Sequence, residues 1–95
     1  MRFRYNKDEE TGLPHIYDHG VSEEEVEHVI LRPGEFRRGR RDSLVVTGQS
    51  RGGRYLRVIY VRDPEPESVF VVTAYEIDGP TLAAYKRRMR RRSRR

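Results

Sequence analysis

The 95-residue chain contains no cysteine and no tryptophan, and lysine is almost absent, because Lys7 and Lys86 are the only lysines among its 20 basic residues. Without cysteine, disulfide bonds and cysteine-based metal sites are excluded, and a reducing compartment is compatible with the sequence. No apolar run approaches the roughly 18 residues of a membrane-spanning helix, and Met1–Arg4 leads into no apolar signal segment. We therefore expect a soluble, cytoplasmic protein with no membrane partner.

Apolar residues are also scarce, at 35% against 37% charged residues, so the core must be thin. This length and composition predict one small domain over residues 1–85. The remaining residues, 86–95, form an arginine-rich tail, which we expect either to end the last helix or to be disordered.

Charge of one sign is missing from long stretches of the chain. Residues 1–35 hold four bases and nine acids, whereas residues 36–62 hold eight arginines and a single acid. Residues 63–85 hold five acids and no base, and residues 86–95 hold eight bases and no acid. Two separate basic blocks in a chain of net charge +5 favour a polyanionic partner such as nucleic acid or an acidic protein.

The clearest local signal is a helix start at Ser22. Its hydroxyl can accept a hydrogen bond from the Glu25 amide while the Glu25 carboxylate reaches back, which is a capping box. Val21 and Val26 form the matching hydrophobic staple, and Pro33-Gly34 ends the helix.

Three strand-like runs follow, at residues 43–50, 54–62 and 68–77, in addition to a short edge strand at residues 3–5. The short linkers predict an antiparallel meander, and Gly79-Pro80 then opens a last helix. The element order is β-α-β-β-β-α, an α+β two-layer sandwich of an antiparallel sheet packed by helices. Strict alternation in the third run would place Phe70, Val72 and Ala74 on one face and Val69, Val71, Thr73 and Tyr75 on the other.

The segments "HGVS" (19–22), "GQSRGGRYLRVIY" (48–60) and "VFVVTAY" (69–75) resemble BrnT-like toxins and the related DUF4258 domains of the RelE-like group. The resemblance implies a RelE-like sheet with flanking helices, and its members of known activity are endoribonucleases neutralised by an antitoxin. His19-Gly20-Val21 match the family's helix entry, and Tyr85 matches a tyrosine of the final helix. The chain lacks the lysine and asparagine that usually precede the His-Gly-Val of BrnT, and the Thr73-Ala74 ending is nearer to DUF4258.

Metal-independent RNA cleavage needs groups that move protons and donors that stabilise charge on the phosphate. The candidates for this chemistry are His19, Arg54, Arg57, Tyr60 and Tyr75. Each also has a structural interpretation: His19 could anchor its turn through a backbone carbonyl, the arginines could pair with acids such as Glu76, and the tyrosines could be core residues. No helical spacing joins the three histidines, so we expect neither a metal nor a cofactor.

The basic blocks supply candidate nucleic-acid-binding residues, namely Arg37, Arg38, Arg40, Arg41, Lys86, Arg87, Arg88, Arg90 and Arg91. The same charges could dock an acidic antitoxin segment or remain solvated. The expected partners are therefore RNA, including mRNA on the ribosome, and an acidic antitoxin, with a homodimer as a further arrangement.

Three functions remain open from the sequence. The chain could be the endoribonuclease toxin of a type II toxin–antitoxin pair, a non-catalytic RNA- or protein-binding module of the same fold, or a regulatory subunit that acts within an oligomer.

Overall fold

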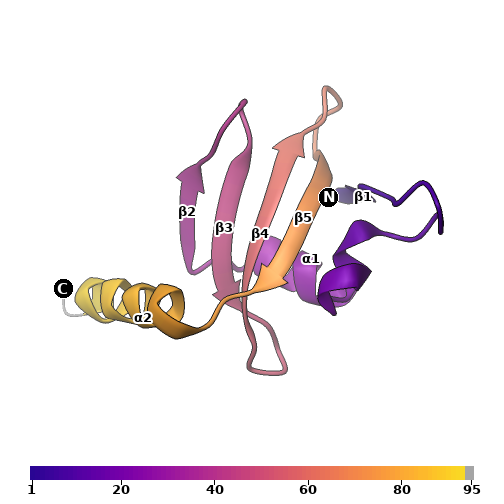
Figure 1. Ribbon diagram of the computed structural model, residues 1–95. Helices are drawn as coiled ribbons and strands as arrows, with labels where there is room; N and C mark the ends of the chain where they lie inside the picture. The colour runs from indigo at the N-terminus through magenta and orange to yellow at the C-terminus, as the bar shows by residue number, and fades with distance from the viewer. Residues whose placement is uncertain (94–95) are drawn as a thin grey trace.

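A five-stranded sheet forms the centre of the computed structural model, which describes residues 1–93 (Figure 1). Its strands lie in the order β1-β5-β4-β3-β2, and β1 runs parallel to β5 while all other neighbours are antiparallel. Along the chain the elements are β1 (Arg2–Tyr5), the 3₁₀ helix η1 (His15–His19), α1 (Glu23–Leu31), β2 (Glu35–Arg38), β3 (Leu44–Gln49), β4 (Tyr55–Arg62), β5 (Ser68–Glu76) and α2 (Gly79–Ser93).

The predicted α+β class and element order are confirmed, with two additions. The sheet is mixed, because β1 returns to the edge of β5 in parallel register from Arg2 opposite Ser68 to Tyr5 opposite Val71. Strand β2 was not predicted, since its sequence "EFRR" is short and mostly charged and it is held as an edge strand by pairing with β3. Among the described residues, no helix is both long enough and apolar enough to cross a bilayer.

Helix α1 lies against one face of the sheet, behind it in Figure 1, and covers the core. The predicted capping box is present: Ser22 Oγ accepts from the Glu25 amide, and the Glu25 carboxylate accepts from the Ser22 amide. Val21 and Val26 are both buried, as the staple requires. Leu56 and Val58 of β4, each 0% exposed, lie in the same core cluster.

The predicted facing of β5 is wrong in its first half. A register shift opposite Ile59 and Tyr60 leaves Val72 as an extra residue, so Ala74 rather than Thr73 pairs with Val58. A bulge reverses the alternation of the residues on one side of it. Val69, Val71 and Ala74 therefore all face α1, while Phe70, Thr73 and Tyr75 share the opposite face.

Helix α2 crosses the lower end of that opposite face, near β2 and β3 (Figure 1). It is anchored by Tyr85, which is 4% exposed and lies against Gly34, where a Cβ would overlap the tyrosine hydroxyl. Two hydrogen bonds from Arg88 to the Glu35 carboxylate add a second attachment. Residues 86–93 form the last turns of α2, and Arg94 and Arg95 of the predicted tail lie outside the described residues.

Candidate functional site

The sheet face away from α1, called the open face below, carries the arginine and tyrosine candidates that the structure brings together. Arg57 on β4 is directly opposite Tyr75 on β5 and Thr47 on β3. Its Nε donates to Thr47 Oγ1 at 3.3 Å, which fixes the guanidinium over the sheet. Residues three apart on a strand point to opposite faces, so only one of Arg54 and Arg57 can share a face with Tyr75, and that residue is Arg57.

His19 reaches the same place from another part of the chain. It is the last residue of η1, and Gly20 follows in the left-handed conformation at φ 69°, where a residue without Cβ is favoured. The exposed His19 ring lies edge-on to the Tyr75 ring, with 6.3 Å between the ring centroids. The turn is closed by backbone hydrogen bonds from Gly20 N to Tyr17 O and from Val21 N to Ile16 O, so the histidine ring is not what closes it.

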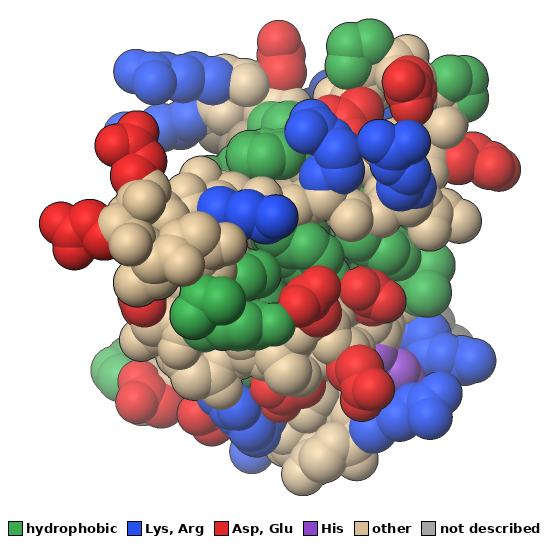
Figure 2. All heavy atoms as spheres, turned by 90° about the vertical axis from the view of Figure 1, so that its right-hand side faces the viewer, with side chains coloured by type: hydrophobic (Ala, Val, Ile, Leu, Met, Phe, Trp, Pro, Cys, Tyr) green, Lys and Arg blue, Asp and Glu red, His purple; other side chains and the backbone are tan. Residues whose placement is uncertain are grey.

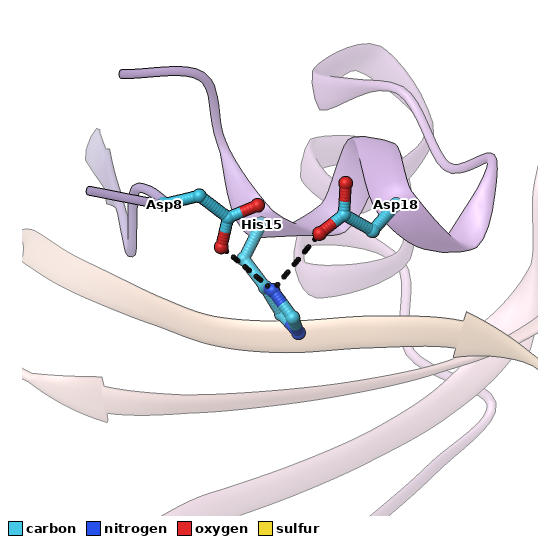
Figure 3. Close-up of side chains that lie close together, drawn as sticks. All are labelled: Asp8, His15 and Asp18. Carbon is cyan, nitrogen blue, oxygen red and sulfur yellow. Dashed lines mark hydrogen bonds and ion pairs between the residues drawn. The ribbon is translucent and has the colours of Figure 1, made fainter. Parts of the chain in front are cut away.

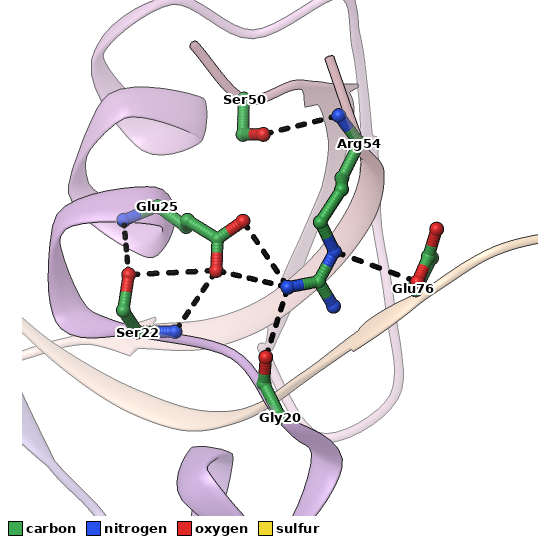
Figure 4. Close-up of polar contacts among 6 residues, drawn as sticks. All are labelled: Gly20, Ser22, Glu25, Ser50, Arg54 and Glu76. Atoms are coloured by element: carbon green, nitrogen blue, oxygen red, sulfur yellow. Dashed lines mark hydrogen bonds and ion pairs between the residues drawn. The ribbon is translucent and has the colours of Figure 1, made fainter. Parts of the chain in front are cut away.

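Arg54 lies apart from this group, on the α1 side of the sheet (Figure 4). Its Nη1 donates to the Gly20 carbonyl at 2.9 Å and to the Glu25 carboxylate, and its Nε lies 3.4 Å from Glu76. The Arg54 backbone amide also donates to Ser50 Oγ at 3.2 Å. These contacts join the start of α1 to the ends of β4 and β5, which is the structural interpretation of this arginine.

Tyr60 is also separated from the group, because it belongs to the core beneath α1. Its side chain is 7% exposed, and burial raises the pKa of its hydroxyl. Of the five candidates for proton transfer or phosphate stabilisation, the structure therefore gathers His19, Arg57 and Tyr75 and places Arg54 and Tyr60 elsewhere.

A hollow of about 590 Å³, called the arginine hollow below, continues from Arg57 towards α2. It lies between β2, β4 and one side of α2, and its lining residues are Glu35, Phe36, Arg37, Arg57, Thr81, Ala84, Arg88 and Arg92. Arg37 and Arg88 were predicted as nucleic-acid-binding residues, and Arg92 was not. The i, i+4 spacing of Arg88 and Arg92 on one helix face was the signal that could have identified it.

The other predicted nucleic-acid-binding residues lie outside this hollow. Arg38 ends β2, and Arg40 and Arg41 lie in the turn between β2 and β3, all exposed. Lys86 rests with its ammonium 5.0 Å from the centre of the Tyr55 ring. The rest lie on exposed positions of α2: Arg87, Arg90 and Arg91.

The side of the molecule that carries β1 and η1 has mixed charge. Figure 2 shows acidic and basic side chains around an apolar band on this side, with no continuous basic patch. A phosphate backbone would meet carboxylates there, so the open face and the arginine hollow are better placed to receive it.

In the described part of the chain, one group of three side chains could hold a metal ion. Ligand atoms of Asp8, His15 and Asp18 lie within 4.8 Å of one another, and Figure 3 shows both carboxylates turned towards His15 Nδ1. The distances from Nδ1 are 3.1 Å to Asp8 and 3.6 Å to Asp18. The pKa of Asp8 is lowered by hydrogen bonds with Asp18 and His15, and that of Asp18 is raised by the bond with Asp8. His15 Nδ1 thus lies within ion-pair distance of both carboxylates.

Comparison with known proteins gives one family match. Residues 15–76, which include α1 and strands β2 to β5, match the family model DUF4258, described as a domain of unknown function. The match spans most of the chain and includes His19, Arg57 and Tyr75. No curated protein and no solved structure matches the chain.

Proposed function

The chain belongs to the DUF4258 family, and from that premise we propose that it binds single-stranded RNA on the open face of its sheet and cleaves it without a metal ion. The observation that carries the proposal is that Tyr75 lies beside the His19 ring and is paired with Arg57 across β5 and β4, although the three residues come from three different elements. Together they offer two groups that move protons and one fixed guanidinium.

The chemistry required is attack of the RNA 2′-hydroxyl oxygen on the adjacent phosphorus. The P–O bond to the 5′-oxygen breaks as the new P–O bond forms, which leaves a 2′,3′-cyclic phosphate and a 5′-hydroxyl. One proton leaves the 2′-hydroxyl and another reaches the departing 5′-oxygen, and His19 and Tyr75 are the residues assigned to these transfers. Arg57 stabilises the charge on the non-bridging phosphate oxygens through its terminal nitrogens.

The side chains exposed on the open face also suit single-stranded RNA. Tyr75 and Phe70 are partly exposed on it, beside Arg57 and Arg4, and unpaired bases stack on aromatic rings and guanidinium planes. Double-stranded RNA is recognised mostly by its shape and backbone, so it would make less use of these side chains.

The resemblance to BrnT-like proteins of the RelE-like group extends this proposal. It supports a toxin of a type II pair that acts on mRNA in the cytoplasm and is neutralised by an acidic antitoxin covering the open face. An acidic segment would complement the arginines at positions 37, 57 and 92 in the same way as RNA phosphates do.

A non-catalytic RNA-binding module is the second candidate, and one observation favours it. Two of the five candidate residues are committed elsewhere: Arg54 to Gly20, Glu25 and Glu76, and Tyr60 to the core. Arg57 is then the one member of the candidate group left to stabilise the phosphate, and the same face could bind RNA without cleaving it.

The two candidates separate in a cleavage assay on a labelled single-stranded RNA with a chelator present. Cleavage by the parent protein, lowered about 10²–10⁴-fold by Tyr75→Phe, is the expected result because a positioned proton-transfer group contributes a factor of that size. Tyr60→Phe is the matched control, and it should retain activity. Growth arrest on expression in a bacterial host, relieved by Tyr75→Phe at equal soluble level, would extend the result to the toxin.

Binding without cleavage would sink the catalytic proposal and leave the binding module. Equal loss of activity in the Tyr60 and Tyr75 variants would place the chemistry elsewhere, since their hydroxyls lie on opposite faces of the sheet.

A further inference from the structure

The arginine hollow has an excess of positive charge that its own residues do not neutralise. Four of its eight lining residues are arginines and one, Glu35, is an acid. Glu35 is already held by Arg88, through two hydrogen bonds to its two carboxylate oxygens. Within residues 1–93, no acidic side chain lies within ion-pair distance of Arg37, Arg57 or Arg92.

The field of these arginines acts on Glu35 itself. The pKa of the Glu35 carboxyl is lowered first by its hydrogen bonds with Arg88, and charge interactions with Arg88, Arg92 and Arg57 lower it further. One carboxylate therefore interacts with three arginines at once. A second anion entering the hollow would meet the same charges with Glu35 already satisfied.

Two of the three arginines, Arg57 and Arg92, are held in place before any ligand arrives. Thr47 accepts from Arg57 Nε, and the Gly34 carbonyl accepts from Arg92 Nη1 at 3.1 Å, so each guanidinium has one fixed donor and others left to give. The seating of Tyr85 on Gly34 sets the distance of α2 from the sheet. Preorganised donors of this kind lose little side-chain entropy on binding, which favours a specific site over diffuse attraction.

The volume is also suitable. Ligand sites in proteins are typically about 300–1,000 Å³, and this hollow has about 590 Å³. Arg57 lines the hollow and is also paired with Tyr75. A single strand of RNA lying on the open face would therefore pass from Tyr75 into the arginine hollow.

We infer that the arginine hollow is a phosphate subsite, in which Arg37, Arg57 and Arg92 bind backbone phosphates of the RNA next to the nucleotide held at Tyr75. The inference rests on the proposed RNA binding, and it adds the path that the RNA follows away from Tyr75. It also assigns a role to α2, whose arginines at positions 88 and 92 form a wall of the site. The exposed arginines of α2 outside the hollow have no share in it.

The test compares two double variants with equal loss of charge. Arg37→Gln with Arg92→Gln removes two arginines from the hollow, and Arg51→Gln with Arg62→Gln removes two exposed arginines outside it. Affinity for a fluorescent single-stranded RNA is measured over a series of salt concentrations. Log affinity falls with log salt, and each lost phosphate contact makes that slope less steep by about 0.7. The slope of the hollow variant should therefore be less steep than that of the parent by about 1.4. The control should keep the parent slope, and equal slopes in the two variants would overturn the inference.

A second probe separates this inference from the proposed function. Inorganic tripolyphosphate is titrated into the ¹⁵N-labelled protein, and the expected result is amide shifts confined to β2, β4 and the last turns of α2. If the protein shows these shifts but does not bind RNA, the hollow is an anion site and the proposed RNA function is wrong. Shifts spread over every arginine-bearing segment would show diffuse attraction only and reject the subsite.

Discussion

The two faces of the sheet use the same strands for opposite purposes. Towards α1, β4 presents Leu56, Val58 and Tyr60, all buried in one apolar cluster. Away from α1, the residues between them are half-exposed and include Arg57. A sheet in a chain with so few apolar residues can close one face fully, and the face left open is then available for polar chemistry.

The same contrast separates Arg57 of β4 from Arg54, the residue just before that strand. Arg54 is committed to the closed side, where it joins a turn, a helix and a strand. Arg57 has one neutral partner, the Thr47 hydroxyl. Three residues along a strand change both the face and the electrostatic surroundings, which teaches that an arginine count alone says little about anion binding.

The largest effect should come from truncating matched valines on the two faces of β4. Val58→Ala removes two methyl groups from a side chain that is 0% exposed, and should lower the free energy of unfolding by about 2 kcal/mol. Val61→Ala on the open face should cost about 0.5 kcal/mol. Urea unfolding of both variants checks this, and equal losses would show that the open face is covered in solution.

A smaller difference is expected between the two arginines. Arg54→Gln leaves the partly buried Glu25 carboxylate without its cation and the Gly20 carbonyl without its donor, and should cost about 1 kcal/mol. Arg57→Gln should change stability by less than about 0.5 kcal/mol. Thermal unfolding at matched pH measures both, and the reverse order would contradict the division of roles drawn above.

The smallest effect concerns Arg4, which lies at the edge of the open face and forms an ion pair with Asp63. Its guanidinium makes two hydrogen bonds to Asp63, at 2.9 and 2.7 Å, and Ser68 donates to the same carboxylate. These bonds, Arg4 first, lower the pKa of Asp63 from 3.8 to about 2.

Because that pKa is lower in the folded protein, the pair stabilises the fold above the ordinary pKa of the carboxyl and is lost as pH falls towards 2. We therefore expect the Asp63→Asn variant to be less stable than the parent at about pH 5, and we expect this difference to shrink as the pH falls to about 2. Melting temperatures across that range measure it. A difference that stays constant with pH would mean that the carboxylate charge contributes nothing.

Much of the fold was predictable because its signals are local. The capping box at Ser22 lies within four residues, and the strand pattern of β4 is regular along its length. The bulge in β5 was not predictable, since Val72 is an ordinary strand residue and only the pairing with β4 shows that it is extra. Strand β2 was not predictable for a related reason, because its hydrogen bonds come from pairing with β3.

For the candidate site, the sequence by itself determined the residue types, the two basic blocks and the opposite facing of Arg54 and Arg57. The tertiary structure decided which of them meet. His19 reaches Tyr75 through the packing of η1 on β5, and Arg88 reaches Glu35 across 53 residues of chain. Such contacts depend on how helices and strands pack after they form. The residues that share a surface are therefore set by long-range packing, which the spacing of residues along the chain does not record.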